Sequence, residues 1–394
     1  MAKMIASSLF LLLGALSFIA MIQGQDQSGF ISIDCGLPDN SIYTEKNTGI
    51  NYISDANFID SGVSKTVSPQ DKTTDQQYFD YLRSFPNGIR NCYSINVTSV
   101  KRYLIRASFL YGNYDGLNKL PEFDLYLGVH FWETVKFTDS SVSINYELIH
   151  TLSLDYIQIC LVNKGTGTPF ISVIEMRILG NVATSYVTIE SSTSLARFQR
   201  LYFSSFTNLI YRYQYDPYDR IWEPYWDDKW RLISSNYSNQ ALDQDSFIPP
   251  AVVLETAATS INDTASLEFH WDNDDNKTQH QYYFYLYLTE LQQLGADQTR
   301  SFNINMDGET WNTLESLQYG KVYTKHVRGL SSGCKKCRIS LIRTESSTLP
   351  PIISALEIYL AKNFSSQSET NKDAEFGKQQ LNRFGFKRTP SKTK

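Results

Sequence analysis

Two ten-residue stretches decide the fold, because each repeats the other across the length of the chain. The first is Pro169-Phe-Ile-Ser-Val-Ile-Glu-Met-Arg-Ile178, and the second is Pro351-Ile-Ile-Ser-Ala-Leu-Glu-Ile-Tyr-Leu360. Pro, Ile, Ser and Glu are identical at four of the ten positions, at an offset of 182 residues. Ile, Val and Leu are typical of buried β-strands, so each stretch predicts the last strand of a repeated unit.

Two further matches extend the repeat toward the start of each unit. Phe123-Asp-Leu-Tyr-Leu127 matches Phe302-Asn-Ile-Asn-Met306 at an offset of 179, and Ile159-Cys-Leu-Val162 matches Ile339-Ser-Leu-Ile342 at an offset of 180. In the first pair, apolar and polar residues alternate with period two, which is typical of a half-buried strand. The sequence therefore predicts an all-β fold of two tandem β-sandwiches of the jelly-roll type.

The length of the chain fits this duplication. It has 394 residues, and a domain usually holds about 100–200 residues. We expect the first sandwich at residues 28–181 and the second at residues 195–362. Residues 366–394 are polar and basic, and they predict a disordered tail.

Composition and charge narrow the classes of function. The chain is 42% hydrophobic and 20% charged, which is typical of a folded globular protein. Its formal net charge is −5, so it lacks the basic footprint that binding to nucleic acid requires. Aromatic residues make up 14% of the chain. Short strands account for most of them, and we look for binding where they are locally dense.

The N-terminus predicts export from the cell. Residues 1–24 begin with Lys3, continue in an apolar run around Leu9–Leu13 and end at Gly24 before polar residues. This is the pattern of a secretory signal peptide, and no second apolar stretch of about 20 residues predicts a membrane-spanning helix. We therefore expect a secreted or cell-surface protein, with membrane association if the signal stays uncleaved or a longer form exists.

Five sequons for N-glycosylation agree with this route. Each has the form Asn-x-Ser/Thr without proline, and such sites imply exposed positions on an exported protein. The five asparagines are Asn96, Asn236, Asn262, Asn276 and Asn363.

Five cysteines in an oxidising compartment predict disulfides and leave one thiol over. Cys35 with Cys92 is the favoured bridge. Cys160 lies in an apolar run, and we expect it to be a buried free thiol. Cys334 and Cys337 have C-x-x-C spacing. This favours a local disulfide, because a zinc site needs about four ligands and the chain offers no partner motif.

Several motifs along the chain point to one family. They are Phe30-Ile-Ser-Ile-Asp-Cys-Gly36, Arg83-Ser-Phe-Pro-Asn-Gly-Ile-Arg-Asn-Cys-Tyr93, Tyr103-Leu-Ile-Arg-Ala-Ser-Phe-Leu-Tyr-Gly-Asn-Tyr-Asp-Gly116, Pro121-Glu-Phe-Asp-Leu-Tyr-Leu-Gly128, Phe247-Ile-Pro-Pro250 and Ser347-Thr-Leu-Pro-Pro351. Together they resemble the malectin-like ectodomains of plant receptor-like kinases. The resemblance extends over residues 28–365.

The resemblance implies two malectin-like β-sandwich domains from the extracellular part of a leucine-rich-repeat receptor-like kinase. It implies a non-catalytic recognition module that binds a protein or peptide partner or a co-receptor, or, as the alternative, a carbohydrate. Family members usually continue into leucine-rich repeats, a transmembrane helix and a kinase, and the sequence shows none of their motifs. We therefore expect a truncated or soluble ectodomain.

The first candidate binding site is a loop in the first half. In animal malectin, aromatic rings and an aspartate at one end of the sandwich form the sugar pocket, and the resemblance places Tyr111, Tyr114 and Asp115 in the matching loop. Aromatic faces stack on sugar C–H groups while polar groups orient the hydroxyls. The later loop at residues 163–168 has no acidic residue. The alternative is an ordinary turn with Tyr111 packed on the rim of the sandwich.

The second candidate is the densest aromatic stretch, from Tyr211 to Trp230. Within it Tyr215, Trp222, Trp226 and Trp230 alternate with Arg and carboxylates, and Tyr, Trp and Arg dominate protein-binding hot spots. The alternative is structural, a long connection that covers the second sandwich. The family places this stretch near the cleft between the domains, which leaves both interpretations open.

Signals of catalysis and of metal binding are weak. Gly329-Leu-Ser-Ser-Gly333 has the G-x-S-x-G spacing, but a nucleophile elbow needs a strand before it and a helix after it. Asp272–Asn276 resembles the start of a calcium loop but lacks its central Gly and its final Glu. A carbohydrate-active enzyme is a remote alternative, since no feature selects a facing pair of carboxylates. We expect no catalytic residue, no metal and no cofactor.

Overall fold

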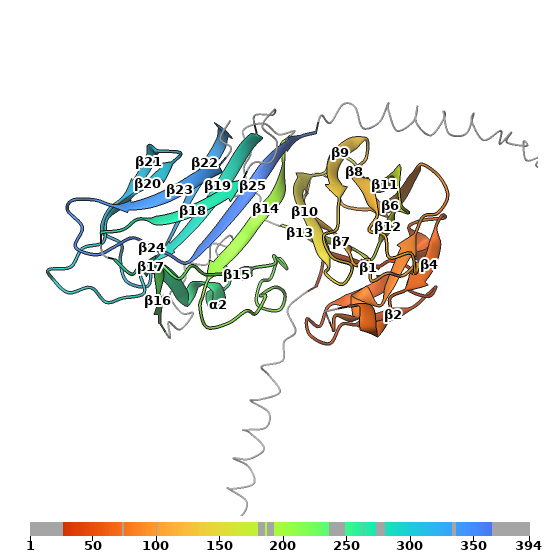
Figure 1. Ribbon diagram of the computed structural model, residues 1–394, viewed down its shortest axis with the longest axis horizontal. Coiled ribbons are helices and arrows are strands. Elements are labelled where there is room, and N and C mark those ends of the chain that lie inside the picture. The colour runs from red at the N-terminus through yellow and green to blue at the C-terminus, as the bar shows by residue number, and fades with distance from the viewer. Residues whose placement is uncertain are drawn as a thin grey trace, which may run out of the picture.

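The computed structural model shows two lobes that lie side by side (Figure 1). It describes residues 27–72, 75–99, 101–179, 186, 193–235, 249–262, 264–272, 280–332 and 336–364. The predicted signal peptide at residues 1–24 and the predicted tail at residues 366–394 lie outside these described residues. Within them, no helix is long and apolar enough to cross a membrane.

Almost every element is a β-strand. Lobe 1, red to yellow in Figure 1, contains β1 (Phe30–Asp34), β2 (Ile42–Thr44), β3 (Asn51–Ser54), β4 (Val63–Thr66), β5 (Tyr81–Ser84), β6 (Arg90–Asn96), β7 (Arg102–Phe109), β8 (Glu122–Leu127), β9 (His130–Val135), β10 (Ile144–Thr151), β11 (Tyr156–Thr166), β12 (Phe170–Ile171) and β13 (Val173–Ile178). Three short 3-10 helices belong to the same lobe: η1 (Asp55–Asn57), η2 (Pro69–Asp71) and η3 (Gln77–Phe79).

Lobe 2 is built in the same way. Green to blue in Figure 1, it contains β14 (Thr193–Phe203), β15 (Glu223–Tyr225), β16 (Trp230–Ser234), β17 (Thr256–Ser260), β18 (Leu267–Asp272), β19 (His280–Thr289), β20 (Phe302–Met306), β21 (Glu309–Leu314), β22 (Val322–Ser332), β23 (Lys336–Arg343), β24 (Ile352–Ile353) and β25 (Ala355–Asn363). Its one helix in the described residues is the single turn α2 (Ala251–Leu254).

The two lobes repeat one topology. Lobe 1 has the sheets β6-β11-β8-β9 and β12-β5-β4, and lobe 2 has the matching sheets β18-β23-β20-β21 and β24-β17-β16. The orders β13-β7-β10 and β25-β19-β22 match within a larger sheet. The quoted repeat forms β12 and β13 in one lobe and β24 and β25 in the other, so the all-β, duplicated fold is confirmed. The domain limits at residues 28–181 and 195–362 stay a proposal that this repetition supports.

Alternation of side chains fills the core of each lobe. In β8 the buried side chains are Phe123, Leu125 and Leu127, and in β20 Phe302 and Ile304 are buried in the same way. Successive side chains of a strand point to opposite faces of the sheet, which places every second residue inside. Each lobe has its own apolar cluster, and a third cluster lies where the lobes meet.

One continuous sheet joins the lobes. β10 of lobe 1 pairs antiparallel with β14 of lobe 2 through the residue pairs Leu148↔Ala196 and Ile149↔Leu195. The resulting sheet has the order β2-β3-β1-β13-β7-β10-β14-β25-β19-β22, and β15 also pairs with β14. Because the backbone hydrogen bonds set the spacing of neighbouring strands, this ladder fixes one lobe against the other.

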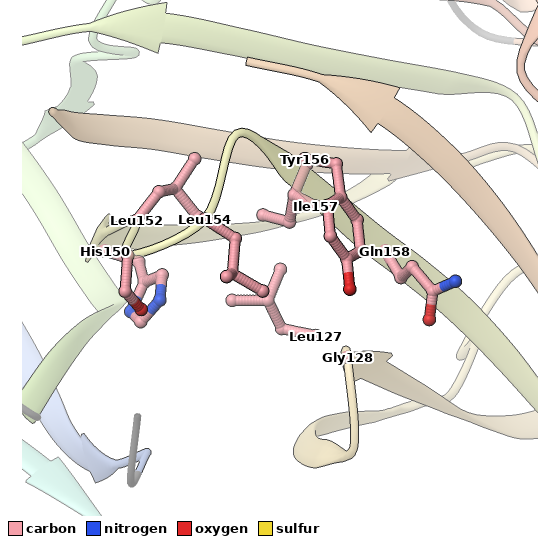
Figure 2. A pocket seen from close by; sticks show the side chains of 9 residues that line it. Leu127, Gly128, His150, Leu152, Leu154, Tyr156, Ile157 and Gln158 are labelled. Carbon is pink, nitrogen blue, oxygen red and sulfur yellow. The ribbon is translucent and has the colours of Figure 1, made fainter. Parts of the chain in front are cut away.

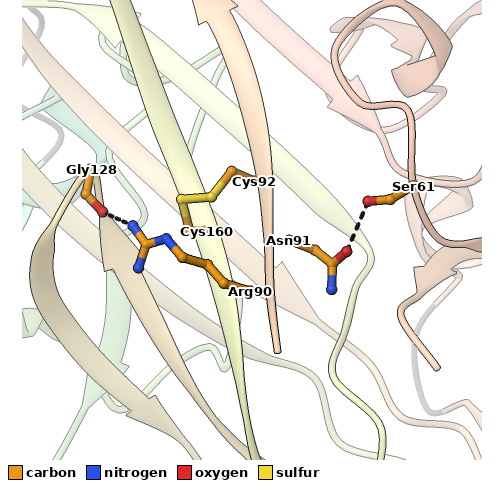
Figure 3. Close-up of a disulfide and its surroundings, with 6 residues drawn as sticks. All are labelled: Ser61, Arg90, Asn91, Cys92, Gly128 and Cys160. Atoms are coloured by element: carbon orange, nitrogen blue, oxygen red, sulfur yellow. Dashed lines mark hydrogen bonds between the residues drawn. A yellow bond between two sulfur atoms is a disulfide. The ribbon is translucent and has the colours of Figure 1, made fainter. Parts of the chain in front are cut away.

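The disulfide differs from the prediction. Cys92 in β6 and Cys160 in β11 form the bridge; they are register partners, with their Cα atoms 4.0 Å apart (Figure 3). The predicted bridge between Cys35 and Cys92 is therefore wrong, and so is the prediction that Cys160 is a free thiol. Among the described residues, the free cysteine is Cys35, and it is buried.

The alternation of β11 gives the physical reason. Ile159 and Leu161 belong to the core of lobe 1, so Cys160 between them points to the other face of the strand, toward Cys92. Cys35 lies within the core and does not reach that face.

Two contacts beside the bridge join β6 to neighbouring segments. Arg90 in β6 donates a hydrogen bond to the carbonyl of Gly128, and Ser61 donates to Oδ1 of Asn91 at 2.9 Å (Figure 3). Of the C-x-x-C pair, Cys337 is disulfide-bonded, and Cys334 lies outside the described residues.

Candidate functional site

The loop after β7 brings together the three residues of the first candidate site. The Tyr111 hydroxyl donates to Oδ1 of Asp115 at 2.6 Å, and the ring centroids of Tyr111 and Tyr114 lie 5.7 Å apart. The hydroxyl of Tyr114 lies 2.9 Å from Oγ of Ser84, and burial raises the pKa of Tyr114 to about 12. Tyr111 is fully buried, while Tyr114 and Asp115 keep part of their surface. Glycan binding here stays a prediction that rests on Tyr114 and Asp115.

The second candidate site belongs to a segment that we call the connection, residues 204–222 between β14 and β15. In its second half, residues 212, 213, 216 and 219–222 are buried. Trp222 is fully buried and donates its indole N–H to Oδ2 of Asp216 at 2.8 Å. The prediction that Trp222 contacts a ligand does not hold in this structure, because its side chain offers no surface.

The other three aromatic residues of this candidate site have separate positions. Trp230 packs in the core of lobe 2 and is 5% exposed. Trp226 is half-buried against the same core, and Tyr215 is exposed. The structure therefore does not bring the predicted residues into one binding surface, and Tyr215 and Trp226 are the ones that a partner can reach.

The buried half of the connection belongs to a network of charged side chains between the lobes. Five arginines and five carboxylates are joined by ion pairs, and none of them is exposed. We call this the interlobe charge network, and its members are Arg106, Glu147, Glu175, Arg177, Arg200, Arg212, Asp216, Asp219, Arg220 and Glu357.

Two arginines carry the network from one lobe to the other. Arg106 in β7 contacts Glu147 at 3.0 Å within lobe 1 and Asp219 of the connection at 3.3 Å. Arg200 in β14 contacts Glu147 at 2.6 Å across the junction and Glu357 of lobe 2 at 2.8 Å. Both lobes and the connection are therefore held by shared charge pairs.

The connection inserts its own arginine into lobe 1. Arg212 donates to Glu175 and to Asp219, both at 2.7 Å, and to the hydroxyl of Tyr78 at 3.1 Å. The ring of the next residue, Tyr213, meets Phe30 at a centroid distance of 5.2 Å. Charge-assisted hydrogen bonds of this kind are shorter and stronger than neutral ones.

The arginines of the network lower the pKa of four of its carboxyl groups. Burial alone raises a carboxyl pKa, but the guanidinium groups outweigh this effect and lower the pKa of Glu147 to about 2, chiefly through Arg200 and Arg106. Arg212 and Arg106 likewise lower the pKa of Glu175 to about 2 against its burial. The pKa values of Asp219 and Glu357 are also lowered by their arginine partners.

The connection also carries large apolar side chains that face solvent, three in its first half and Tyr215 in its second. The exposed fractions are 75% for Phe206, 60% for Leu209, 58% for Ile210 and 61% for Tyr215. We call these four residues the apolar segment. The sequence analysis missed three of them, although three large apolar residues without strand or helix period in a polar loop were a readable signal.

A pocket in lobe 2 lies where β16, β17 and β18 meet. It has a volume of about 540 Å³ and is open to solvent, and its lining includes Lys229, Trp230, Ile261, Glu268 and His270. Nε2 of His270 lies 3.4 Å from Oε2 of Glu268. This pocket combines one aromatic residue with groups of both charges.

A smaller pocket in lobe 1 lies at the turn between β10 and β11 (Figure 2). Much of its lining is aliphatic and includes Leu127, Leu152 and Ile157. His150 borders it, with Nδ1 at 2.6 Å from Oγ of Ser194, and burial lowers the pKa of His150 to about 4. The imidazole is therefore neutral at pH 7, and we assign no ligand to this pocket.

Three of the five predicted glycosylation sites can be placed. Asn96, Asn262 and Asn363 are exposed, as acceptor sites must be. Asn236 and Asn276 lie outside the described residues. Within the described ranges, no group of three or more His, Cys, Asp or Glu side chains is arranged to hold a metal ion.

Comparison with curated proteins finds plant receptor-like kinases that are similar to this chain. A family model for the malectin-like domain matches residues 33–361. A probable LRR receptor-like serine/threonine-protein kinase of Arabidopsis thaliana is 41% identical over 363 residues, which is 91% of this chain and 41% of that protein. The chain therefore spans about two fifths of the length of this relative.

Solved structures share the fold at low identity. The ANX2 ectodomain of Arabidopsis thaliana matches with a TM-score of 0.69 at 17% identity, covering 84% of this chain and 97% of that one. A chain in the crystal structure of the plant peptide RALF23 with FER and LLG2 matches with a TM-score of 0.64 at 15% identity, covering 84% and 95%. The match of the family model across both lobes shows that this chain belongs to the malectin-like domain family.

Proposed function

We propose that the chain is an extracellular, non-catalytic recognition module that binds a peptide or protein partner through the apolar segment. The observation that carries the proposal is the exposure of Phe206, Leu209, Ile210 and Tyr215 within ten residues of one loop. Large apolar side chains that gather on a surface mark interaction sites, and aromatic anchors supply much of the binding energy.

The second half of the connection prepares this surface for binding. Tyr211 and Trp222 exchange backbone hydrogen bonds of 3.0 and 2.7 Å, which close residues 211–222 into a loop pinned by the interlobe charge network. The ring of Tyr215 lies 5.2 Å from the ring of Tyr211. Tyr215 lies within this closed loop and is therefore held in place before a partner binds. A residue that is already ordered loses less conformational entropy on binding, so more of its contact energy appears as affinity.

The relatives support the class of partner and the location. One curated relative is a probable receptor-like kinase, and a solved chain of this fold comes from the complex of the peptide RALF23 with FER and LLG2. By analogy, we propose a peptide or co-receptor partner at the cell surface.

A glycan is the second candidate ligand, because Tyr114 and Asp115 keep part of their surface at the rim of lobe 1. A glycan array with the purified protein tests it. Binding that is lost in the Tyr114→Ala protein would support this candidate, and a blank array would remove it.

Capture from plant cell surfaces with matched variants tests the main proposal. The parent protein, a Phe206→Ser/Ile210→Ser variant and a Leu117→Ser control are each used as bait. Leu117 is 69% exposed on the lobe 1 loop, so the control removes equivalent apolar surface elsewhere. We expect a partner that the parent and the control bind alike and the double variant binds at least about tenfold more weakly. Equal binding by all three proteins would contradict the proposal.

A further inference from the structure

The lobe 2 pocket has a sequon on its rim. Neither the pocket nor the sequon belongs to the apolar segment. Asn262 lines the pocket and is exposed at the end of β17. Its Oδ1 accepts hydrogen bonds from the backbone N–H of Thr264 at 3.1 Å and from its hydroxyl at 2.9 Å. The acceptor side chain is thus held by its carbonyl oxygen, while no described residue accepts from its nitrogen.

The surroundings of Asn262 suit a sugar. Ile261 beside it is 57% exposed and offers an apolar face, and Trp230 lines the pocket nearby. Lys229, Glu268 and His270 add donors and acceptors on the same lining. Sugar rings present apolar C–H faces and hydroxyl edges, and sites that hold them combine apolar contact with a few polar groups.

We propose that Asn262 carries an N-linked glycan and that the first sugars of this glycan lie in the lobe 2 pocket. The donor is a lipid-linked oligosaccharide diphosphate in the secretory pathway. Nδ2 of Asn262 forms a bond to the anomeric carbon, the bond from that carbon to the diphosphate oxygen breaks, and the proton leaves Nδ2 as the lipid diphosphate departs. The proposal rests on the extracellular location in the proposed function.

Attachment decides which sugar occupies the pocket. A tethered ligand meets a neighbouring site at an effective concentration in the millimolar range, so even weak contacts hold it there. A free sugar therefore competes poorly for the pocket with a sugar that is covalently attached beside it. The attached glycan covers the exposed side chain of Ile261.

The first experiment maps the modification in protein secreted from plant cells. Mass spectrometry of proteolytic peptides compares the parent with Asn262→Gln, Thr264→Ala and Thr264→Ser variants. We expect a glycan on Asn262 in the parent and in Thr264→Ser, which keeps the sequon, and none in the other two. An unmodified Asn262 in the secreted parent would overturn the proposal.

The second experiment tests the position of the glycan. The rate at which a peptide N-glycosidase releases it from native protein is compared between the parent and a Lys229→Ala/His270→Ala variant. Both substituted side chains are exposed, so the fold is expected to survive. We expect release from the variant to be about tenfold faster, the ratio that corresponds to ~1.4 kcal/mol of lost contact. Equal rates would show that the glycan does not lie in the pocket.

A melting curve gives an independent readout. We expect the melting temperature of the Asn262→Gln protein to be about 2–4 °C below that of the parent. The Asn96→Gln protein, which is changed at an exposed sequon of lobe 1, should have the same melting temperature as the parent. Equal melting of Asn262→Gln and parent would count against packing of the glycan. None of these measurements uses a partner, so the glycan proposal can fail while partner binding through the apolar segment stands, and the reverse.

Discussion

The two halves of the connection reverse the usual distribution of residue types. Arg212, Asp216 and Asp219 are charged and lie inside, whereas Phe206 and Ile210 are apolar and lie outside. Charged side chains are rarely buried unless they are paired, and large apolar side chains seldom gather at a surface without a role. The comparison teaches that the buried half has a structural task, and it motivates our proposal that the exposed half binds.

The physical cost of buried charges suggests one structural task for the buried half, which is to favour a single arrangement of the lobes. Taking ions out of water costs several kcal/mol each, and their mutual attraction offsets this only when every partner is present. The interlobe charge network meets this condition, since its members have several partners each. Arg106, for example, contacts Glu147, Glu175 and Asp219. A displaced lobe would leave unpaired charges, so the network favours one arrangement of the lobes.

Acidification is expected to have the largest effect, because it neutralises several carboxylates of the network together. The pKa values of Glu147 and Glu175 are about 2 in the folded protein, below the value of about 4.3 for an unfolded Glu. Their contribution to stability is therefore complete above about pH 4.5 and is lost as the pH falls toward 2. Thermal melts across this range should show a steep fall in melting temperature, and a flat profile would contradict the network.

Removing one arginine should have the next largest effect. Arg106→Met leaves the five buried carboxylates of the network with four arginines, so one buried negative charge is no longer balanced. We expect it to lower the free energy of unfolding by about 3–5 kcal/mol in denaturant titrations. The control is Arg338→Ala, which breaks an exposed pair with Glu268 and should cost at most about 1 kcal/mol. Similar losses in both variants would show that burial does not distinguish the two pairs.

Two uncharged side chains, the tryptophans Trp222 and Trp226, test the same difference between buried and accessible residues. Trp222→Phe removes the indole N–H that donates to Asp216 and should destabilise the fold by about 1–3 kcal/mol. Trp226→Phe changes a half-buried ring and should cost about 0.5 kcal/mol or less. Denaturant titrations of both proteins measure the difference. A larger loss for Trp226→Phe than for Trp222→Phe would contradict the structural role assigned to Trp222.

The smallest effect on stability is expected at the exposed half. Phe206→Ser/Ile210→Ser should change the free energy of unfolding by about 0.5 kcal/mol or less per site, since surface substitutions seldom do more. The same protein should show the loss of partner binding described above. A strongly destabilised variant would mean that these side chains belong to the core instead.

The strand pattern was readable from the sequence because it depends on local periodicity. The alternation in Phe123–Leu127 and the repeat ending at Ile178 and Leu360 identify strands that occupy matching places in the two lobes. The same rule, applied to Ile159 and Leu161, would have turned Cys160 away from the core and toward its true partner.

The charge network was harder to predict, because its members are far apart in the sequence. Arg106 and Glu147 are 41 residues apart, and Arg200 and Glu357 are 157 apart, and they meet only once the sheets are assembled. Two signals were present. The first signal is an arginine, Arg106, within an apolar strand. The second is an acidic residue at the same position of both repeated stretches, Glu175 in the first and Glu357 in the second. Neither signal names a partner without the strand order.

Hydrogen exchange along residues 204–222 tests the comparison most directly. The amides of Tyr211, Asp216 and Trp222 donate backbone hydrogen bonds in the buried half, and we expect them to exchange only when the fold opens as a whole. The amides of Phe206 and Leu209 bond only to nearby side-chain oxygens, and we expect them to exchange near the rate of an unfolded chain. Equal exchange in the two halves would contradict a loop that is locked at one end and open at the other.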